Sequence, residues 1–194
     1  MIVAARLALA NCVEAVFVFV DREAEHTYMI DTTTLNALAD FPRQLEAHYA
    51  AIPAPFKHWS PPSWDTVPSE PFTPIEQICH VRDIEIDGYH LRFRRALDEH
   101  NPTLPGVDGF ALVHARAYAT AEAGEVFAAF RKARSQTIQL LSCLGNAELA
   151  RPAFFEDYGP TTLRGLVHYL CSHDQQHLAG LQWLRGKIEG RPIH

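Results

Sequence analysis

The chain lacks the cysteine and charge patterns that mark several protein classes. Its 194 residues include four cysteines, none in a Cys-x-x-Cys pair. They are Cys12, Cys79, Cys143 and Cys171. This wide spacing argues against a disulfide scaffold or a zinc finger, and it indicates free thiols in a reducing compartment, so we expect a cytoplasmic protein. The formal net charge of −6 leaves no basic excess, which argues against nucleic-acid binding.

Several motifs are also absent. There is no glycine-rich phosphate loop, no Gly-x-Ser-x-Gly element, no internal repeat and no alternating strand pattern beyond the first 28 residues. Hydrophobic residues make up 47% and charged residues 21% of the chain, so it can bury a core in a single domain. Helical periodicity with no predicted sheet favours an all-α fold, an antiparallel four-helix bundle.

The N-terminal stretch, residues 1–28, differs from the rest. It is largely apolar to Val20, but Glu14 interrupts the run where a signal peptide or a membrane span would need continuous apolar residues. We therefore expect no membrane association. Met29 is followed at once by a helix start. We expect residues 1–28 to be an extension or an over-called start, and residues 29–194 to form the bundle domain.

Four long helices are predicted after this extension. The first covers residues 31–51, where Pro42 is expected to kink or split it. The second starts at a capping box at residue 73 and continues to about residue 97. The third is predicted over residues 116–144 and the last over 161–184. The connections between them are irregular, and we expect them to shape any substrate pocket.

The last helix carries two histidines on its apolar stripe. The stripe consists of Leu163, Leu166, Leu170, His173, His177, Leu181 and Leu184. Residues four apart differ by about 40° around a helix, so both imidazoles face the same way, toward the core. They are either hydrogen-bonded core histidines or metal ligands. The motif is not that of a zinc protease, because Asp174 stands where a glutamate would be needed.

His80 lies on the second helix, away from its apolar stripe. That stripe is formed by Ile75, Ile78, Cys79, Ile86, Tyr89, Phe93 and Leu97. By rotation of about 100° per residue, His80 instead shares a face with Ile84, Asp87 and Leu91. Spacing alone therefore does not nominate His80 as a functional residue.

Five short segments follow one another in an order and spacing that resemble a known family. They are Thr73–Asp83, Arg92–Arg95, Asn101–Pro105, Gly159–Leu163 and His173–His177. Through them, residues 31–187 resemble the DinB-like superfamily of metal-binding four-helix bundles. The resemblance implies a bundle of DinB type with irregular loops.

The resemblance also implies a metal site. His80 would supply a third ligand beside His173 and His177. Three neutral imidazoles with open positions suit a divalent transition metal such as zinc, nickel or iron. Two alternatives are open for Asp174: it orients a ligand ring from the second shell of the metal, or it pairs with an arginine of a neighbouring helix. The family further suggests a homodimer and a small-molecule substrate.

Three functions are compatible with such a site. The first is a transferase in which the metal activates a low-molecular-weight thiol. The second is a metal-dependent hydrolase, for which Asp174 and Glu85 are the only visible candidates as general acid or base. The third is a non-catalytic stress or interaction bundle that the metal only braces.

Other polar and sulfur-containing residues have simpler interpretations. Cys79 and Cys171 do not share a helical face with the neighbouring histidines, and we expect both to be small buried apolar residues. The cluster of Arg92, Arg94 and Arg95 is expected to form a solvated face. The alternative is that one of these arginines faces an anionic substrate near the mouth of the bundle.

Overall fold

The computed structural model describes residues 29–191. The predicted extension, residues 1–28, lies outside the described residues, as do residues 192–194. The larger helical elements are α2 (Thr32–Ala50), α3 (Pro74–Asp83), the π-helical segment η2 (Ile84–Tyr89), α4 (His90–Asp98), α6 (Ala123–Ser142) and α8 (Leu163–Glu189). Shorter elements are η1 (Ala54–Phe56), α5 (Gly109–Ala115), η3 (Tyr118–Thr120) and α7 (Asn146–Leu149), together with the strands β1 (Thr103–Leu104), β2 (Pro152–Phe155) and β3 (Gly159–Thr162).

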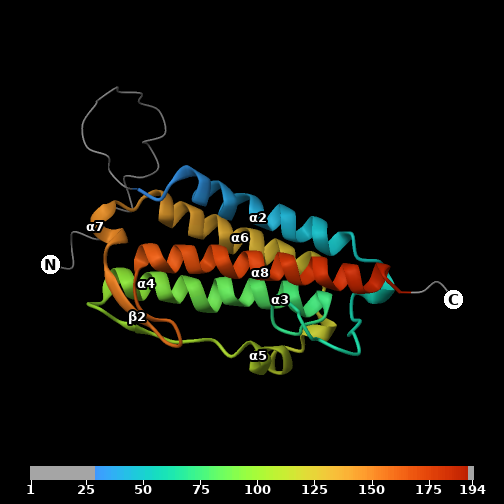
Figure 1. The fold of residues 1–194 in the computed structure, drawn as a ribbon. Coiled ribbons are helices and arrows are strands. Elements are labelled where there is room, and N and C mark those ends of the chain that lie inside the picture. The colour runs from blue at the N-terminus through green and yellow to red at the C-terminus, as the bar shows by residue number, and fades with distance from the viewer. Residues whose placement is uncertain (1–28, 192–194) are drawn as a thin grey trace.

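Four long helical segments lie side by side, as the sequence predicts. Helices α2, α6 and α8 and the joined segment α3–η2–α4 run along the length of the molecule (Figure 1). The predicted starts of the first two are confirmed: the Asp31 carboxylate accepts a hydrogen bond from Thr34 N at 2.8 Å, and Thr73 and Glu76 form the capping box. Pro42 does not split the first helix, because α2 continues through it. Within residues 29–191, no helix is both long and apolar enough to cross a membrane.

The second long segment changes its winding at η2. A π-helical turn holds more residues than an α-helical one, so the faces after it are rotated relative to those before it. Ile86, predicted on the apolar stripe, is therefore 37% exposed, while the Glu85 side chain beside it is buried. The prediction for Ile86 is wrong for this reason. Helix α3 is buried almost all round because α5, α6, α8 and η3 all pack on it.

The third long helix begins later than predicted. Ala117 has φ 46°, a left-handed conformation that an α-helix cannot contain, so no helix continues from residue 116 past Ala117. The segment 109–120 instead forms the short elements α5 and η3, and α6 starts at Ala123.

A small sheet also corrects the prediction of a purely helical fold. β1 pairs in parallel with β2, and β2 pairs antiparallel with β3. β2 alternates exposed and buried side chains, with Phe154 exposed and Phe155 buried. Four residues are too few for this alternation to stand out from the sequence.

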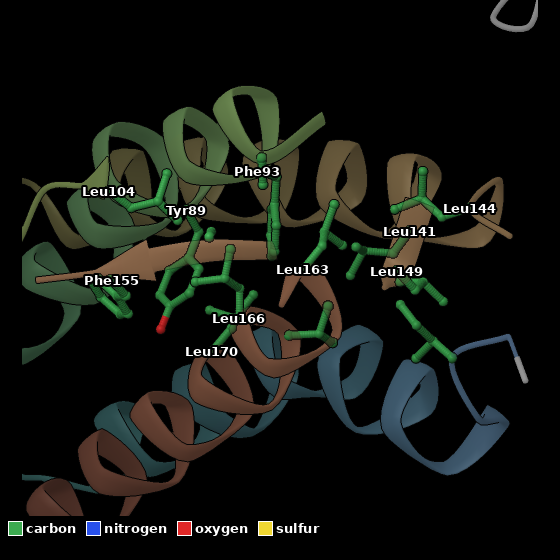
Figure 2. Packing of buried hydrophobic residues seen from close by; sticks show 14 of the residues in the cluster. Tyr89, Phe93, Leu104, Leu141, Leu144, Leu149, Phe155, Leu163, Leu166 and Leu170 are labelled. Carbon is green, nitrogen blue, oxygen red and sulfur yellow. The ribbon is translucent and has the colours of Figure 1, made fainter. Parts of the chain in front are cut away.

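The core consists of two apolar clusters. The first includes Tyr89, Phe93, Leu166 and Leu170, and Figure 2 shows these side chains gathered between α4, α8 and the strand that carries Phe155. The second includes residues of α2, α3, α6 and the C-terminal half of α8. On α8 the first cluster ends at Leu170 and the second starts at Leu178. Between them lie His173, Asp174 and His177, whose side chains belong to a polar layer inside the bundle.

Arg134 of α6 is the centre of that polar layer. Its guanidinium is 2% exposed and donates to both oxygens of Glu85, at 3.0 and 2.9 Å, and to both oxygens of Asp174, at 2.7 and 3.0 Å. Burial alone would lower the pKa of Arg134, but the charges of Asp174 and Glu85 outweigh it and raise that pKa. The hydroxyl of Thr137 also donates to Glu85, at 2.5 Å. These contacts tie η2, α6 and α8 together.

Removal of this guanidinium would leave two buried carboxylates without a counter-ion. We expect Arg134→Ala to lower the free energy of unfolding by about 3–5 kcal/mol, measured by denaturant unfolding. The matched control is Arg131→Ala on the same helix, whose ion pair with Glu46 is half exposed on both sides. An exposed pair contributes little, so the control should lose far less. Equal losses in the two variants would contradict this account of Arg134.

Candidate metal centre

Three imidazoles meet in the polar layer, one from α3 and two from α8. The Nε2 atom of His173 lies 3.2 Å from Nε2 of His80 and 3.1 Å from Nε2 of His177. One nitrogen from each ring lies within 4.8 Å of the others. The structure therefore brings together the three histidines that the sequence and the resemblance nominate.

The tautomer of His177 follows from its neighbour Gln77. The Nδ1 atom of His177 donates to the side-chain oxygen of Gln77. Because that oxygen can only accept, Nδ1 carries the proton and Nε2 presents a lone pair to the other rings. The Gln77 amide nitrogen donates to Ser69 Oγ at 2.9 Å and to the Glu70 carbonyl at 3.1 Å. Gln77 thus fixes both a histidine and the connection that passes over it.

His80 is held on two sides by neighbouring residues. The Phe72 ring lies 5.1 Å from it, centroid to centroid. On the other side Gly109 approaches so closely that a Cβ atom there would lie 2.6 Å from His80 Cε1. A side chain at position 109 would displace the ring. Nδ1 of His80 and Nδ1 of His173 have no hydrogen-bond partner in the described part of the chain.

A carboxylate that the sequence did not suggest lies beside the histidines. Oxygens of Glu70 are 3.8 Å from Nε2 of His80 and 3.5 Å from Nε2 of His177, and Glu70 is 36% exposed. It belongs to the proline-rich connection before α3, which has no periodicity that could predict where a side chain points. The only signal was the general expectation that such connections shape the pocket.

These residues fit a divalent metal ion. Burial lowers the pKa of His80 to about 4, and burial with the neighbouring histidines lowers the pKa of His173 and His177 well below 6.5. All three rings are thus neutral at pH 7, as metal ligation requires. With the protons of His80 and His173 on Nδ1, three Nε2 lone pairs would face one another and could bind one cation, and a carboxylate beside them adds a further oxygen donor.

Asp174 takes the second of its two predicted roles. Both oxygens of its carboxylate accept hydrogen bonds from Arg134 of the neighbouring helix. Asp174 makes no hydrogen bond to the ring of His173, whose Nδ1 has no partner among the described residues. Burial raises the pKa of Asp174 to about 7, although the charge of Arg134 opposes this. Successive residues on a helix point about 100° apart, so Asp174 faces α6 while His173 faces α3.

His80 and His173 open onto a cavity of about 300 Å³. Glu70, His80 and His173 line one part of it, and Tyr89, Arg92 and Tyr158 are among the residues that line the rest. Of the clustered arginines, Arg94 is exposed, as expected for a solvated face. Arg92 is instead buried and faces the cavity.

The two cysteines near the histidines are poor nucleophiles. Cys79 is buried, as predicted, and Cys171 is half-buried. Burial raises the pKa of Cys79 to about 12 and that of Cys171 to about 11. Neither side chain lines the cavity. Neither Cys79 nor Cys171 is therefore placed to supply a reactive thiol at this site.

Comparison with known proteins identifies a family and a similar solved structure. A family model of the DinB superfamily matches residues 44–181. The solved structure of YfiT from Bacillus subtilis, described as a probable metal-dependent hydrolase with an unusual four-helix bundle topology, has the same fold. It aligns with a TM-score of 0.68 and 18% identity over 90% of this chain and 95% of that chain. No curated protein matches the chain.

The lowered pKa values of the histidines predict a pH dependence of stability. Above pH 6.5 the rings are neutral in both the folded and the unfolded chain. Between pH 6.5 and about 4 the unfolded chain binds protons that folded His80 does not, so stability falls as the pH falls. Each histidine contributes up to about 1.4 kcal/mol per pH unit.

The measurement is denaturant unfolding of the metal-free protein across this range. His80→Gln should show a shallower fall than wild type. The raised pKa of Asp174 contributes with the opposite sign, but it is common to both proteins, so their difference isolates His80. Identical slopes would contradict the assignment of a depressed pKa to His80.

Proposed function

The chain belongs to the DinB superfamily, and from this premise we propose that it is a metal-dependent enzyme acting on a small molecule. The observation that carries the proposal is the convergence of three imidazole Nε2 atoms at the edge of a cavity. His80, His173 and His177 would hold the ion. The donor set suits zinc, nickel or iron. When bound, such an ion supplies Lewis acidity that lowers the pKa of water or of a thiol at neutral pH.

Glu70 favours hydrolysis as the reaction. The sequence offered only Asp174 and Glu85 as general acid or base, and both of these are engaged with Arg134. Glu70 is partly exposed and lies 3.5 Å from His177, so its carboxylate can accept a proton from an attacking water and return it to a leaving group. The description of YfiT as a probable metal-dependent hydrolase supports the same reaction class.

Thiol transfer, predicted from the family resemblance, is the competing reaction. The metal site would be the same, but a low-molecular-weight thiol would replace water as the nucleophile. The non-catalytic, metal-braced bundle is the third possibility. Homodimer formation, the antiparallel order of the helices, the division at residue 29 and a cytoplasmic location stay predictions.

Metal content tests the assignment of the ligands. We expect wild-type protein purified without chelators to carry about one divalent ion per chain, and His177→Ala to lose most of it, since one of three ligands is removed. The control is His168→Ala, an exposed histidine on the same helix. Elemental analysis gives the ion and its stoichiometry. Equal metal in the two variants would refute the site.

Turnover tests the role of Glu70. With a panel of small esters and amides and no added thiol, we expect hydrolysis that falls about 10²- to 10⁴-fold in Glu70→Gln, because a proton acceptor is lost. Exposed Glu125→Gln is the control. Metal content is measured in both, so that a lost base is told apart from a lost ion.

Other outcomes of that assay identify the competing functions. Turnover that appears only after a low-molecular-weight thiol is added would replace hydrolysis by thiol transfer. No turnover with any substrate, together with a large fall in melting temperature on metal removal, would indicate the non-catalytic bundle.

A further inference from the structure

Within residues 29–191 two arginines are buried, Arg92 and Arg134, and of these two only Arg134 is paired with carboxylates. Arg134 has two carboxylates around its guanidinium. Arg92 is 3% exposed, and no carboxylate within residues 29–191 forms an ion pair with it. A buried charge without a counter-ion is costly, because the attraction of water for it is lost and nothing replaces it.

Uncharged groups hold the Arg92 side chain in place. Its Nε and one terminal nitrogen both donate to the Pro105 carbonyl, at 3.1 Å each. The guanidinium carbon lies 5.0 Å from the Tyr89 ring centroid and 4.5 Å from that of Phe155. Figure 2 shows these two rings close together at one end of the first apolar cluster. The other terminal nitrogen has no hydrogen-bond partner among the described residues, so the fork keeps free N–H groups.

Arg92 and the histidine cluster line the same cavity. A single ring separates them: the Tyr89 centroid is 6.4 Å from the His173 centroid. A molecule of a few non-hydrogen atoms could therefore contact both.

We propose that the cavity binds its substrate through a carboxylate group, with Arg92 as the residue that holds that carboxylate while the bond to be cleaved lies at the three-histidine cluster. This rests on the proposed function of that cluster. The guanidinium offers parallel N–H donors with the spacing of carboxylate oxygens, and Tyr89 and Phe155 offer apolar walls for the body of the ligand.

The charges around the cavity favour a carboxylate over a phosphate. Arg92 is the one cationic side chain among the residues that line it, and a dianion would leave a charge unpaired. Glu156 and Asp157 lie at the rim, where they are exposed, so solvent and salt screen their repulsion of a monoanion. Glu156 is also occupied, because it accepts a hydrogen bond from Gly106 N at 3.0 Å. A dianion would meet twice that repulsion.

Binding to metal-free protein tests Arg92 apart from the metal. We expect benzoate to bind wild type and to bind Arg92→Gln about 10- to 100-fold more weakly, since a charge-assisted hydrogen-bond pair is lost. Binding is measured by calorimetry or, in wild type, by the shift of the Arg92 side-chain NMR signal. Inorganic phosphate should bind more weakly than benzoate. Arg94→Gln, the exposed neighbour, should match wild type.

A second variant keeps the test valid if Arg92→Gln does not fold. Arg92→Lys keeps the charge but loses the fork, and we expect benzoate affinity to fall about tenfold. Circular dichroism verifies the fold of each variant. No benzoate binding to wild type, equal binding to wild type and a folded Arg92 variant, or tighter binding of phosphate than of benzoate would each overturn the proposal.

Hydrolysis distinguishes this proposal from the proposed function. In the metal-loaded enzyme, 4-acetoxybenzoate should be preferred over phenyl acetate about tenfold or more, and the preference should disappear in Arg92→Gln. If the two esters are hydrolysed equally by wild type, the carboxylate proposal fails while the metal-dependent activity stands. If His177→Ala keeps its metal, the proposed function fails while benzoate binding still decides the role of Arg92.

Discussion

The fold depends on one buried arginine and the two carboxylates around it. Arg134 joins α6 to Glu85 of η2 and to Asp174 of α8 through four charge-assisted hydrogen bonds. Burying three charges is tolerable only when their geometry leaves none of them unpaired, so this ion cluster permits little relative movement of the three elements. The π-helical winding of η2 is what turns Glu85 inward, away from the exposed Ile86 that follows it. The π-helical geometry of η2 thus places the Glu85 carboxylate where it can pair with Arg134.

The ion cluster and the histidine cluster share α8 and lie on adjoining faces of it, one toward α6 and the other toward α3. Asp174 is held by α6, and its neighbour His173 is consequently directed toward His80 of α3. Gln77 acts from α3, because it fixes the tautomer of His177 and tethers the connection that carries Glu70. Both clusters fall between the two apolar clusters, and the histidine cluster also borders the cavity. Burying this polar layer costs free energy of folding, and in return the neighbouring side chains hold the histidine nitrogens in fixed positions.

Only some residues of the candidate site could be predicted from the sequence, because only some of them follow from a local pattern. His173 and His177 follow from spacing, since one straight helix relates them. His80 could be nominated only through the family resemblance, because α3 is covered on nearly every side and has no single apolar stripe to indicate where its histidine points. Glu70 was missed altogether: its position depends on how an irregular connection is tethered by Gln77. Arg92 was expected at the surface, with a substrate-facing arginine as the alternative. It is buried, donates to the Pro105 carbonyl and lines the cavity.

The sequence by itself determined the helical class, the helix starts at Asp31 and Thr73, and the common face of His173 and His177, because these depend on residues within a few turns of one another. The tertiary structure decided the start of α6, the π-helical turn, the three-stranded sheet and the partner of Asp174. It also decided that one buried arginine is paired and another faces a cavity. Each of these depends on contacts between segments that are distant in the sequence, and local hydrophobic periodicity contains no information about such contacts.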